Sequence, residues 1–214
     1  RAINRFLSVL QPNTTTVVLI SGDVLPCPGS LGRLLRPLKD PQVQMTGGRP
    51  CPINPAGGLV NKIVHFQWTL LDCISRERPK LGEMIAFRAP TEPLVPDTVV
   101  DEAALEAQLT QHAGTLAYVP EATLSNQGPQ RLGDLIDQRE RIWIGHRLLW
   151  KRTGYRVSTS RLIDLCGPAF RYLLRHPKAI PVAIAGAAVE IFARLRGRYR
   201  HGLLGLTPTI WHPI

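Results

Sequence analysis

The pattern of apolar and polar positions divides the chain into alternating strands and helices. Residues 15–20 are β-branched or apolar almost without a break, which predicts a strand that is buried on both faces of a parallel sheet. Further short strands are predicted at 43–46, 84–87 and 116–119. Apolar residues at helical spacing predict helices over 1–10, 28–38, 59–74, 101–113, 128–154 and 179–193. Loops rich in Gly or Pro are predicted at 47–58 and 91–96.

This order of elements predicts an α/β fold, in which a mostly parallel sheet is flanked by helices. The chain has 214 residues with 44% hydrophobic content, which is enough for the core of one domain or slightly more. It does not begin with Met, and its first residues already have the pattern of a helix interior. We therefore expect the chain to be a fragment of a longer protein.

The positive charge is confined to the C-terminal part of the chain. The net charge is +10, and residues 1–130 contain 11 Lys and Arg against 11 Asp and Glu. Residues 131–214 contain 15 basic and 5 acidic side chains, so they carry the whole excess. A segment with this charge can bind anionic lipid, phosphorylated substrates or nucleic acid. The four Cys show no C-x-x-C spacing, which is typical of reduced thiols in the cytosol.

Residues 179–193 are apolar but shorter than the roughly 20 residues that span a bilayer. Glu190 interrupts the run and can pair with Arg194 one turn later. We expect this helix to lie on an anionic membrane surface, with a spanning helix or packing on the catalytic core as alternatives. One helical face is apolar: Ile180, Ile184, Ala188, Ile191 and Leu195. The flanking basic residues expected to contact lipid head groups are Arg171, Arg175, Lys178, Arg194, Arg196, Arg198 and Arg200.

Three acidic residues are candidates for chemistry. Asp101 and Glu102 open a predicted helix, where acidic residues favour the N-terminus and Asp101 can be the N-cap. Asp23 follows the strand at 15–20, where α/β sheets bind ligands, although an Asp just before a Pro-containing segment can also be a turn residue. Gly82 lets a ligand approach the backbone just before the next strand.

The sequence resembles glycosyltransferase family 2 in the order of four motifs. These are Ser21-Gly22-Asp23, the strand that follows Gly82, Asp101-Glu102 and Gln138-x-x-Arg141. The resemblance covers residues 1–155 and implies the C-terminal part of a Rossmann-like GT-A catalytic domain. Residues 156–214 would then be a basic helical extension associated with the membrane. Ile142 stands where the family's longer motif has Trp, which indicates a non-processive member.

The resemblance implies an inverting transfer of sugar from a nucleotide-sugar donor to a hydroxyl acceptor, either a saccharide or lipid-linked, at the cytoplasmic face of the membrane. It makes Asp101 or Glu102 the general base. Asp23 would hold Mg²⁺ or Mn²⁺, although Ser21 leaves the motif without a second carboxylate, so the metal would depend on diphosphate and water. The remaining implied residues are Gln138, Arg139 and Arg141 at the donor diphosphate, and Gly82, Glu83 and Arg88 near the acceptor and donor sugar.

Two other classes of function fit parts of the pattern. A non-catalytic module that binds the membrane surface would explain the C-terminal segment without any chemistry. A nucleic-acid-binding module would explain the charge, but the basic segment has no aromatic stacking platform and no known motif, so nucleic acid is disfavoured. Vesicle binding without nucleotide-sugar binding would identify the first class, and a steep salt dependence of oligonucleotide affinity the second.

Overall fold

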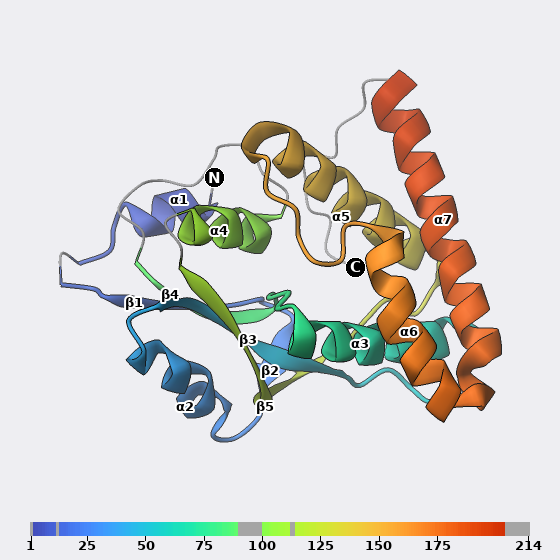
Figure 1. Ribbon diagram of the computed structural model, residues 1–214, viewed down its shortest axis with the longest axis horizontal. Coiled ribbons are helices and arrows are strands. Elements are labelled where there is room, and N and C mark those ends of the chain that lie inside the picture. Colours follow the sequence, from blue (N-terminus) through green and yellow to red (C-terminus); the bar gives the residue numbers. More distant parts are fainter. Residues whose placement is uncertain (1, 12, 90–99, 112–113, 204–214) are drawn as a thin grey trace.

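The computed structural model is a mixed α/β protein with one five-stranded sheet and helices on both of its faces (Figure 1). It describes residues 2–11, 13–89, 100–111 and 114–203, so the loop predicted at 91–96 lies outside the described residues. The strands are β1 (Thr16–Ile20), β2 (Val24–Pro26), β3 (Val43–Pro52), β4 (Met84–Arg88) and β5 (Thr115–Asn126). The α-helices are α1 (Ala2–Leu7), α2 (Ser30–Leu35), α3 (Leu59–Glu77), α4 (Asp101–Thr110), α5 (Leu132–Thr153), α6 (Leu162–Arg175) and α7 (Ile180–Leu203), and the 3-10 helices are η1 (Arg36–Lys39) and η2 (Pro177–Ala179).

The sheet is mixed, so the prediction of a mostly parallel sheet is wrong. The strand order is β1-β4-β3-β5-β2, and of its neighbouring pairs only β3 and β5 run parallel. β1 is an edge strand that runs antiparallel to β4. Val17 and Leu19 pack in one core cluster and Ile20 against another, but Val18 is 37% exposed, so the prediction of burial on both faces is correct only in part. An apolar run carries no information about the direction of the neighbouring strand.

The strand β3 extends through Gly47-Gly48-Arg49-Pro50, which the sequence predicted to be loop. A Cβ atom on Gly48 would lie 2.5 Å from the carbonyl oxygen of Ala122 on β5. The two strands therefore approach each other too closely for any side chain at this position, and the glycine serves the strand pairing rather than a turn.

The core lies on both faces of β4, the most completely buried strand. Met84 and Ala86 face the layer that includes Leu34 of α2, on the lower side of the sheet in Figure 1. The alternate residues of the strand, Ile85 and Phe87, face the opposite layer. Leu105 of α4 belongs to this second layer, whose other buried members are Val17, Met45 and Leu81.

The helices α3, α5, α6 and α7 form a group beside the sheet (Figure 1). Ile63, Val64 and Leu135 are the buried centre of this group, and Val182 of α7 packs against them. The division of the chain at residue 155 stays a prediction. Within the described parts of the chain, no helix is both long and apolar enough to cross a membrane.

Candidate functional site

The antiparallel pairing of β1 with β4 brings two of the predicted motifs together. The register places Ile20 opposite Met84, so the chain leaving β1 lies beside the chain entering β4. The backbone N–H of Ser21 donates to the carbonyl oxygen of Glu83 at 2.8 Å. Asp23 follows in the short turn between β1 and β2. The sequence had placed this site at the end of a parallel strand, whereas the structure forms it where an antiparallel strand pair ends.

Glu83 is a strongly perturbed carboxylate of this site. Burial raises its pKa to about 7, and the negative charge of Glu102 adds to the rise. A hydrogen bond with the Ser21 side chain opposes this rise, and Asp23 contributes to it more weakly. Glu83 also has a φ of 60°, a left-handed conformation that is rare for a residue with a side chain. Because the charges of Glu102 and Asp23 both act on Glu83, these three carboxylates, from two turns and one helix, lie near one another.

Glu102 and Asp101 both lie in the first turn of α4, and the structure separates their roles. Val100 is the N-cap residue, so the prediction that Asp101 caps the helix is wrong. Burial raises the pKa of Asp101, and the charge of Glu102 raises it further. Glu102 lines the large cavity of the molecule, whereas Asp101 is not part of its lining. Of the two candidate bases, only Glu102 lines that cavity.

The cavity has a volume of about 1680 Å³ and runs from the sheet to the helices α5, α6 and α7. Arg88 lies outside it, at the far end of β4, where its guanidinium donates to the carbonyl oxygens of Val43 and Leu38. This arginine joins β4 to β3 and η1 rather than facing the cavity. The predicted site residues that do line the cavity are Asp23, Gly82, Glu83, Glu102, Gln138, Arg139 and Arg141.

The wall of the cavity formed by α5 is rich in nitrogen groups. The Nε atom of Arg139 lies 2.7 Å from Oε2 of Glu190 on α7. Burial lowers the pKa of the Arg141 guanidinium below its ordinary value. His146 also lines the cavity, and burial, with the nearby charges of Lys80 and Arg139, lowers its pKa to about 3. At neutral pH this histidine is an uncharged hydrogen-bonding group, which the sequence did not single out.

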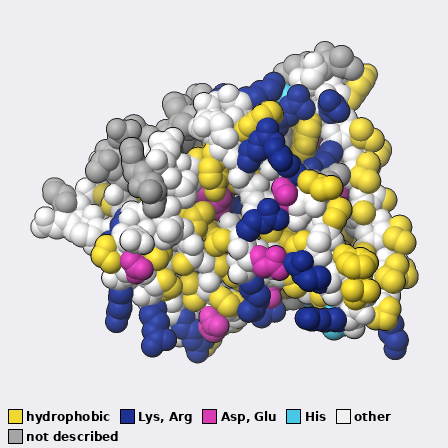
Figure 2. Space-filling model, in the orientation of Figure 1, with side chains coloured by type: hydrophobic (Ala, Val, Ile, Leu, Met, Phe, Trp, Pro, Cys, Tyr) yellow, Lys and Arg dark blue, Asp and Glu magenta, His cyan; other side chains and the backbone are white. Residues whose placement is uncertain are grey.

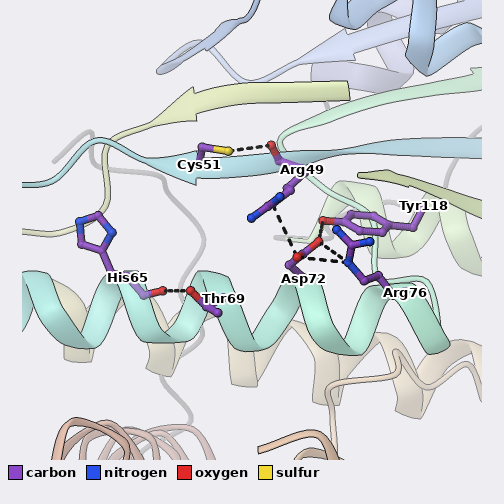
Figure 3. A network of polar contacts seen from close by, with 7 residues as sticks. All are labelled: Arg49, Cys51, His65, Thr69, Asp72, Arg76 and Tyr118. Carbon is purple, nitrogen blue, oxygen red and sulfur yellow. Dashed lines mark hydrogen bonds and ion pairs between the residues drawn. The ribbon is translucent and has the colours of Figure 1, made fainter. Parts of the chain in front are cut away.

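A polar network centred on Asp72 of α3 forms another part of the wall (Figure 3). The hydroxyl of Tyr118 on β5 donates to its carboxylate at 2.8 Å, and Nε of Arg76 donates at 3.2 Å. Arg49 of β3 reaches the other carboxylate oxygen at 3.7 Å. Burial raises the pKa of Tyr118, and the hydrogen bond to Asp72 raises it further. The network fixes α3 to the sheet, and the sequence analysis missed it because its members are far apart in the chain.

Glu106, one turn after Glu102, holds the loop beneath the site. Its fully buried carboxylate accepts a hydrogen bond from the backbone N–H of Leu81 at 2.7 Å and one from the Tyr155 hydroxyl at 3.2 Å. Lys80 lies 3.9 Å away. Burial raises the pKa of Glu106, and Lys80 opposes the rise. The only signal in the sequence was an acidic residue on an otherwise apolar helical face.

The single carboxylate of Asp23 suits a divalent cation that a bound substrate would also coordinate. Over the described ranges, no three His, Cys, Asp or Glu side chains are grouped to hold a metal ion by themselves. Asp23 offers one carboxylate at the rim of the cavity. Mg²⁺ in phosphate-transfer sites commonly takes one or two carboxylates and completes its coordination with phosphate oxygens and water. The residues present fit that arrangement and do not fit a metal site built from protein groups alone.

Comparisons with known proteins support the fold. No family model matches the sequence, and no curated protein matches it. Among solved structures, the chain is similar to the mannosyltransferase PcManGT from Pyrobaculum calidifontis in complex with GDP-Man and Mn²⁺, with a TM-score of 0.54 and 17% sequence identity. The match covers 97% of this chain and 60% of that protein, so the chain spans less than two thirds of its length. A glycosyltransferase therefore has a similar mixed α/β fold.

Proposed function

We propose that the protein transfers a sugar from a nucleotide-sugar donor to a hydroxyl-bearing acceptor. One observation carries the proposal: a single cavity is lined by a carboxylate after β1, a carboxylate at the start of α4 and a Gln-x-x-Arg pair on α5. A carboxylate base and a cationic wall on one cavity are what displacement of a diphosphate by a hydroxyl requires. The similar fold of a mannosyltransferase that was solved with a nucleotide sugar adds support.

In the proposed mechanism, Glu102 acts as general base. Its carboxylate accepts the proton of the acceptor hydroxyl while the hydroxyl oxygen forms a bond to the anomeric carbon. The bond from that carbon to the donor phosphate breaks, and the electron pair leaves with the nucleoside diphosphate. Attack on the face opposite the leaving group inverts the anomeric configuration.

The groups opposite Glu102 hold the leaving diphosphate. Gln138 and Arg141 on α5 donate hydrogen bonds to phosphate oxygens, with Arg139 beside them. Asp23 would hold a divalent cation against the same oxygens, and the cation would neutralise charge as the diphosphate leaves. Gly82 and Glu83 line the space between the base and the metal side, where the sugar and the acceptor would meet.

The test is a transfer assay with a panel of guanosine- and uridine-linked sugars, simple alkyl glycosides as acceptors, and Mn²⁺ or Mg²⁺. We expect release of nucleoside diphosphate from at least one donor, and inversion at the anomeric carbon of the product by NMR. Glu121→Gln is the matched control, because Glu121 is an exposed glutamate outside the cavity. Absence of both transfer and nucleoside diphosphate binding across the panel would overturn the proposal.

A further inference from the structure

The helix α7 turns most of its large apolar side chains away from the protein, although Val182 and Val189 pack inward. Ile184 is 66% exposed and Leu195 is 60% exposed. On the opposite side Gly186, Ala193 and Gly197 pack against the molecule, and an amphipathic helix of a globular protein normally has the reverse arrangement. The exposed apolar residues of α7 recur along one face over its whole length: Ile180, Ile184, Ala187, Ala188, Ile191, Phe192, Leu195 and Tyr199.

The helix α6 carries a second exposed apolar stripe. Ile163, Phe170 and Leu174 are exposed and recur at helical spacing. The other side of α6 faces α3, where the ring of Tyr172 packs edge-on against Phe66 at 5.9 Å. The two helices meet at η2, and Figure 2 shows hydrophobic side chains gathered over them. We call the two stripes together the α6–α7 surface.

The charge of this segment is strongly positive. Residues 162–203 contain seven Lys and Arg against two Asp and Glu. Both acidic residues are already engaged: Glu190 pairs with Arg139 and Arg194, and Asp164 with Arg78. The exposed basic side chains at the α6–α7 turn and along α7 are Arg175, Lys178 and Arg198.

The arginines of α7 divide into two groups, which corrects the expectation that all four contact lipid head groups. Arg196 lies 2.7 Å from Asp137 and 2.9 Å from Glu140, and Arg200 lies 3.3 Å from Glu140. With Arg194 on Glu190, these residues fasten α7 to α5 and to the loop before α6. Arg198 alone among the four is classed as exposed.

We propose that the α6–α7 surface docks on an anionic lipid bilayer. The apolar stripes would enter the boundary between head groups and acyl chains, and Arg175, Lys178 and Arg198 would contact anionic head groups. Charge decides between a bilayer and a second copy of the chain. Pairing two copies through this face would bring two positive fringes together, whereas an anionic bilayer offers opposite charge above an apolar layer.

The cavity opens onto the same surface. Ile184 and Ile191 belong both to the α6–α7 surface and to the lining of the cavity, together with Ile180. A docked molecule would therefore present the apolar end of its cavity to the lipid, while Glu102 and the proposed diphosphate-binding residues of α5 line the same cavity. This places an acceptor whose hydroxyl is attached to a lipid within reach of Glu102, an inference that rests on the proposed sugar transfer.

Co-sedimentation with vesicles of phosphatidylcholine and phosphatidylglycerol tests the docking. Phe170→Glu and Leu195→Glu change exposed residues outside the cavity lining, and each is expected to lower the partition coefficient about tenfold, given the apolar area each would bury. Leu31→Glu, at an exposed leucine on α2, is the matched control and should bind as the parent does. Arg175→Glu with Lys178→Glu should lower binding at least about fivefold at low salt and far less at high salt.

Three results would overturn the docking proposal. The parent chain fails to bind these vesicles, the surface variants bind as tightly as Leu31→Glu, or light scattering shows a dimer that the surface variants dissociate. A second assay then compares transfer to a long-chain alcohol in vesicles with transfer to a soluble alkyl glycoside. The surface variants should lower transfer to the long-chain alcohol and leave transfer to the alkyl glycoside unchanged. If the parent transfers sugar only to the soluble alkyl glycoside, the proposal of a lipid-attached acceptor is wrong. Vesicle binding with neither transfer to any acceptor nor nucleoside diphosphate binding would instead refute the proposed function and leave the docking intact.

Discussion

Arg139 and Glu190 join the wall of the cavity to the C-terminal helix, with 2.7 Å between Nε and Oε2. The other carboxylate oxygen of Glu190 accepts from Nε of Arg194, also at 2.7 Å. The sequence predicted the pair with Arg194, one turn away, which is confirmed. The pair with Arg139 connects residues 51 positions apart, so no local pattern could indicate it. A residue predicted to bind diphosphate is therefore also an anchor for α7.

We expect Glu190→Ala to destabilise the protein by about 2 kcal/mol, because it leaves two partly buried guanidiniums without their carboxylate. The control is Glu77→Ala, at an ion pair with Arg171 in which both side chains are 54% exposed. Exposed pairs contribute about 0–1 kcal/mol, so this variant should unfold close to the parent. Urea unfolding measures both, and equal midpoints for the two variants would contradict the anchoring role.

The same contact predicts a dependence of stability on acid. Burial alone would raise the pKa of Glu190, but Arg139 and Arg194 outweigh it and hold the pKa below the ordinary value of 4.5. A carboxylate with a lowered folded-state pKa stabilises the protein above its unfolded-state pKa, and this contribution is lost as the pH falls through the folded-state value. We expect the parent to lose stability relative to Glu190→Gln below about pH 4.5. A difference that stays constant down to pH 3 would contradict the pairing.

The two acids at the start of α4 should differ in activity. Glu102→Gln should lower turnover by about 10²–10⁴-fold, as the loss of a general base typically does. Asp101→Asn should stay within a few-fold of the parent, since Asp101 is not part of the cavity lining. Donor binding measured by calorimetry should change little in either variant. A larger loss of turnover for Asp101→Asn would transfer the base to that residue.

Glu83 should make stability fall between acidic and neutral pH. Its pKa of about 7 is above the ordinary 4.5, so its protonated form stabilises the fold below pH 4.5 and this stabilisation is lost as the pH rises through 7. The loss can reach about 3 kcal/mol for such a shift. Thermal unfolding of the parent and Glu83→Gln from pH 4 to 8 should show it. Glu102→Gln removes a charge that raises the pKa, so it should move the window to lower pH.

The strands show what the sequence could and could not predict. Four of the five described strands were located from apolar runs, because burial on a pleated surface leaves a local pattern, whereas the three-residue β2 was not predicted. The full extent of β5 was not predicted, since the expected strand covered only 116–119. The register moves from Gly48 opposite Val119 to Arg49 opposite Thr123, so Pro120 lies in a bulge where no ladder N–H is needed. Which strands pair with each other depends on residues far apart in the chain, so no local sequence pattern indicates the pairing.

The candidate site follows the same division. Glu102 and Gln138 were predicted from motif order, and both line the cavity. Asp72, Glu106 and His146 were missed, because their roles arise from contacts with β5, Leu81 and the cavity wall rather than from spacing. The sequence favoured an outward apolar face on α7, and its named residues are exposed, but it left packing on the core open because an apolar stripe has the same sequence pattern in both settings.

Asp23→Ala should weaken the binding of nucleoside diphosphate in the presence of Mn²⁺ at least tenfold and leave binding in chelator unchanged. The reason is that Asp23 supplies the carboxylate expected to bridge the protein and the cation. Isothermal titration calorimetry with and without Mn²⁺ separates the two conditions. Asp40→Ala is the control, because Asp40 is exposed and lies outside the cavity lining. Equal affinities of Asp23→Ala and the parent with Mn²⁺ would make Asp23 a turn residue only.

Two glycines on α7 test whether the helix is seated tightly on α5. A Cβ atom at Gly197 would lie 3.0 Å from the Trp143 ring and 3.2 Å from Glu140, whereas one at Gly202 meets nothing within 4 Å. We expect Gly197→Ala to destabilise the protein by about 1–3 kcal/mol through overpacking. Gly202→Ala should be neutral or stabilise the protein by up to about 1 kcal/mol, because alanine favours the helix. Similar unfolding free energies for the two variants would mean that α7 is free to move away from α5, and that its exposed apolar face is not held in a fixed orientation for docking.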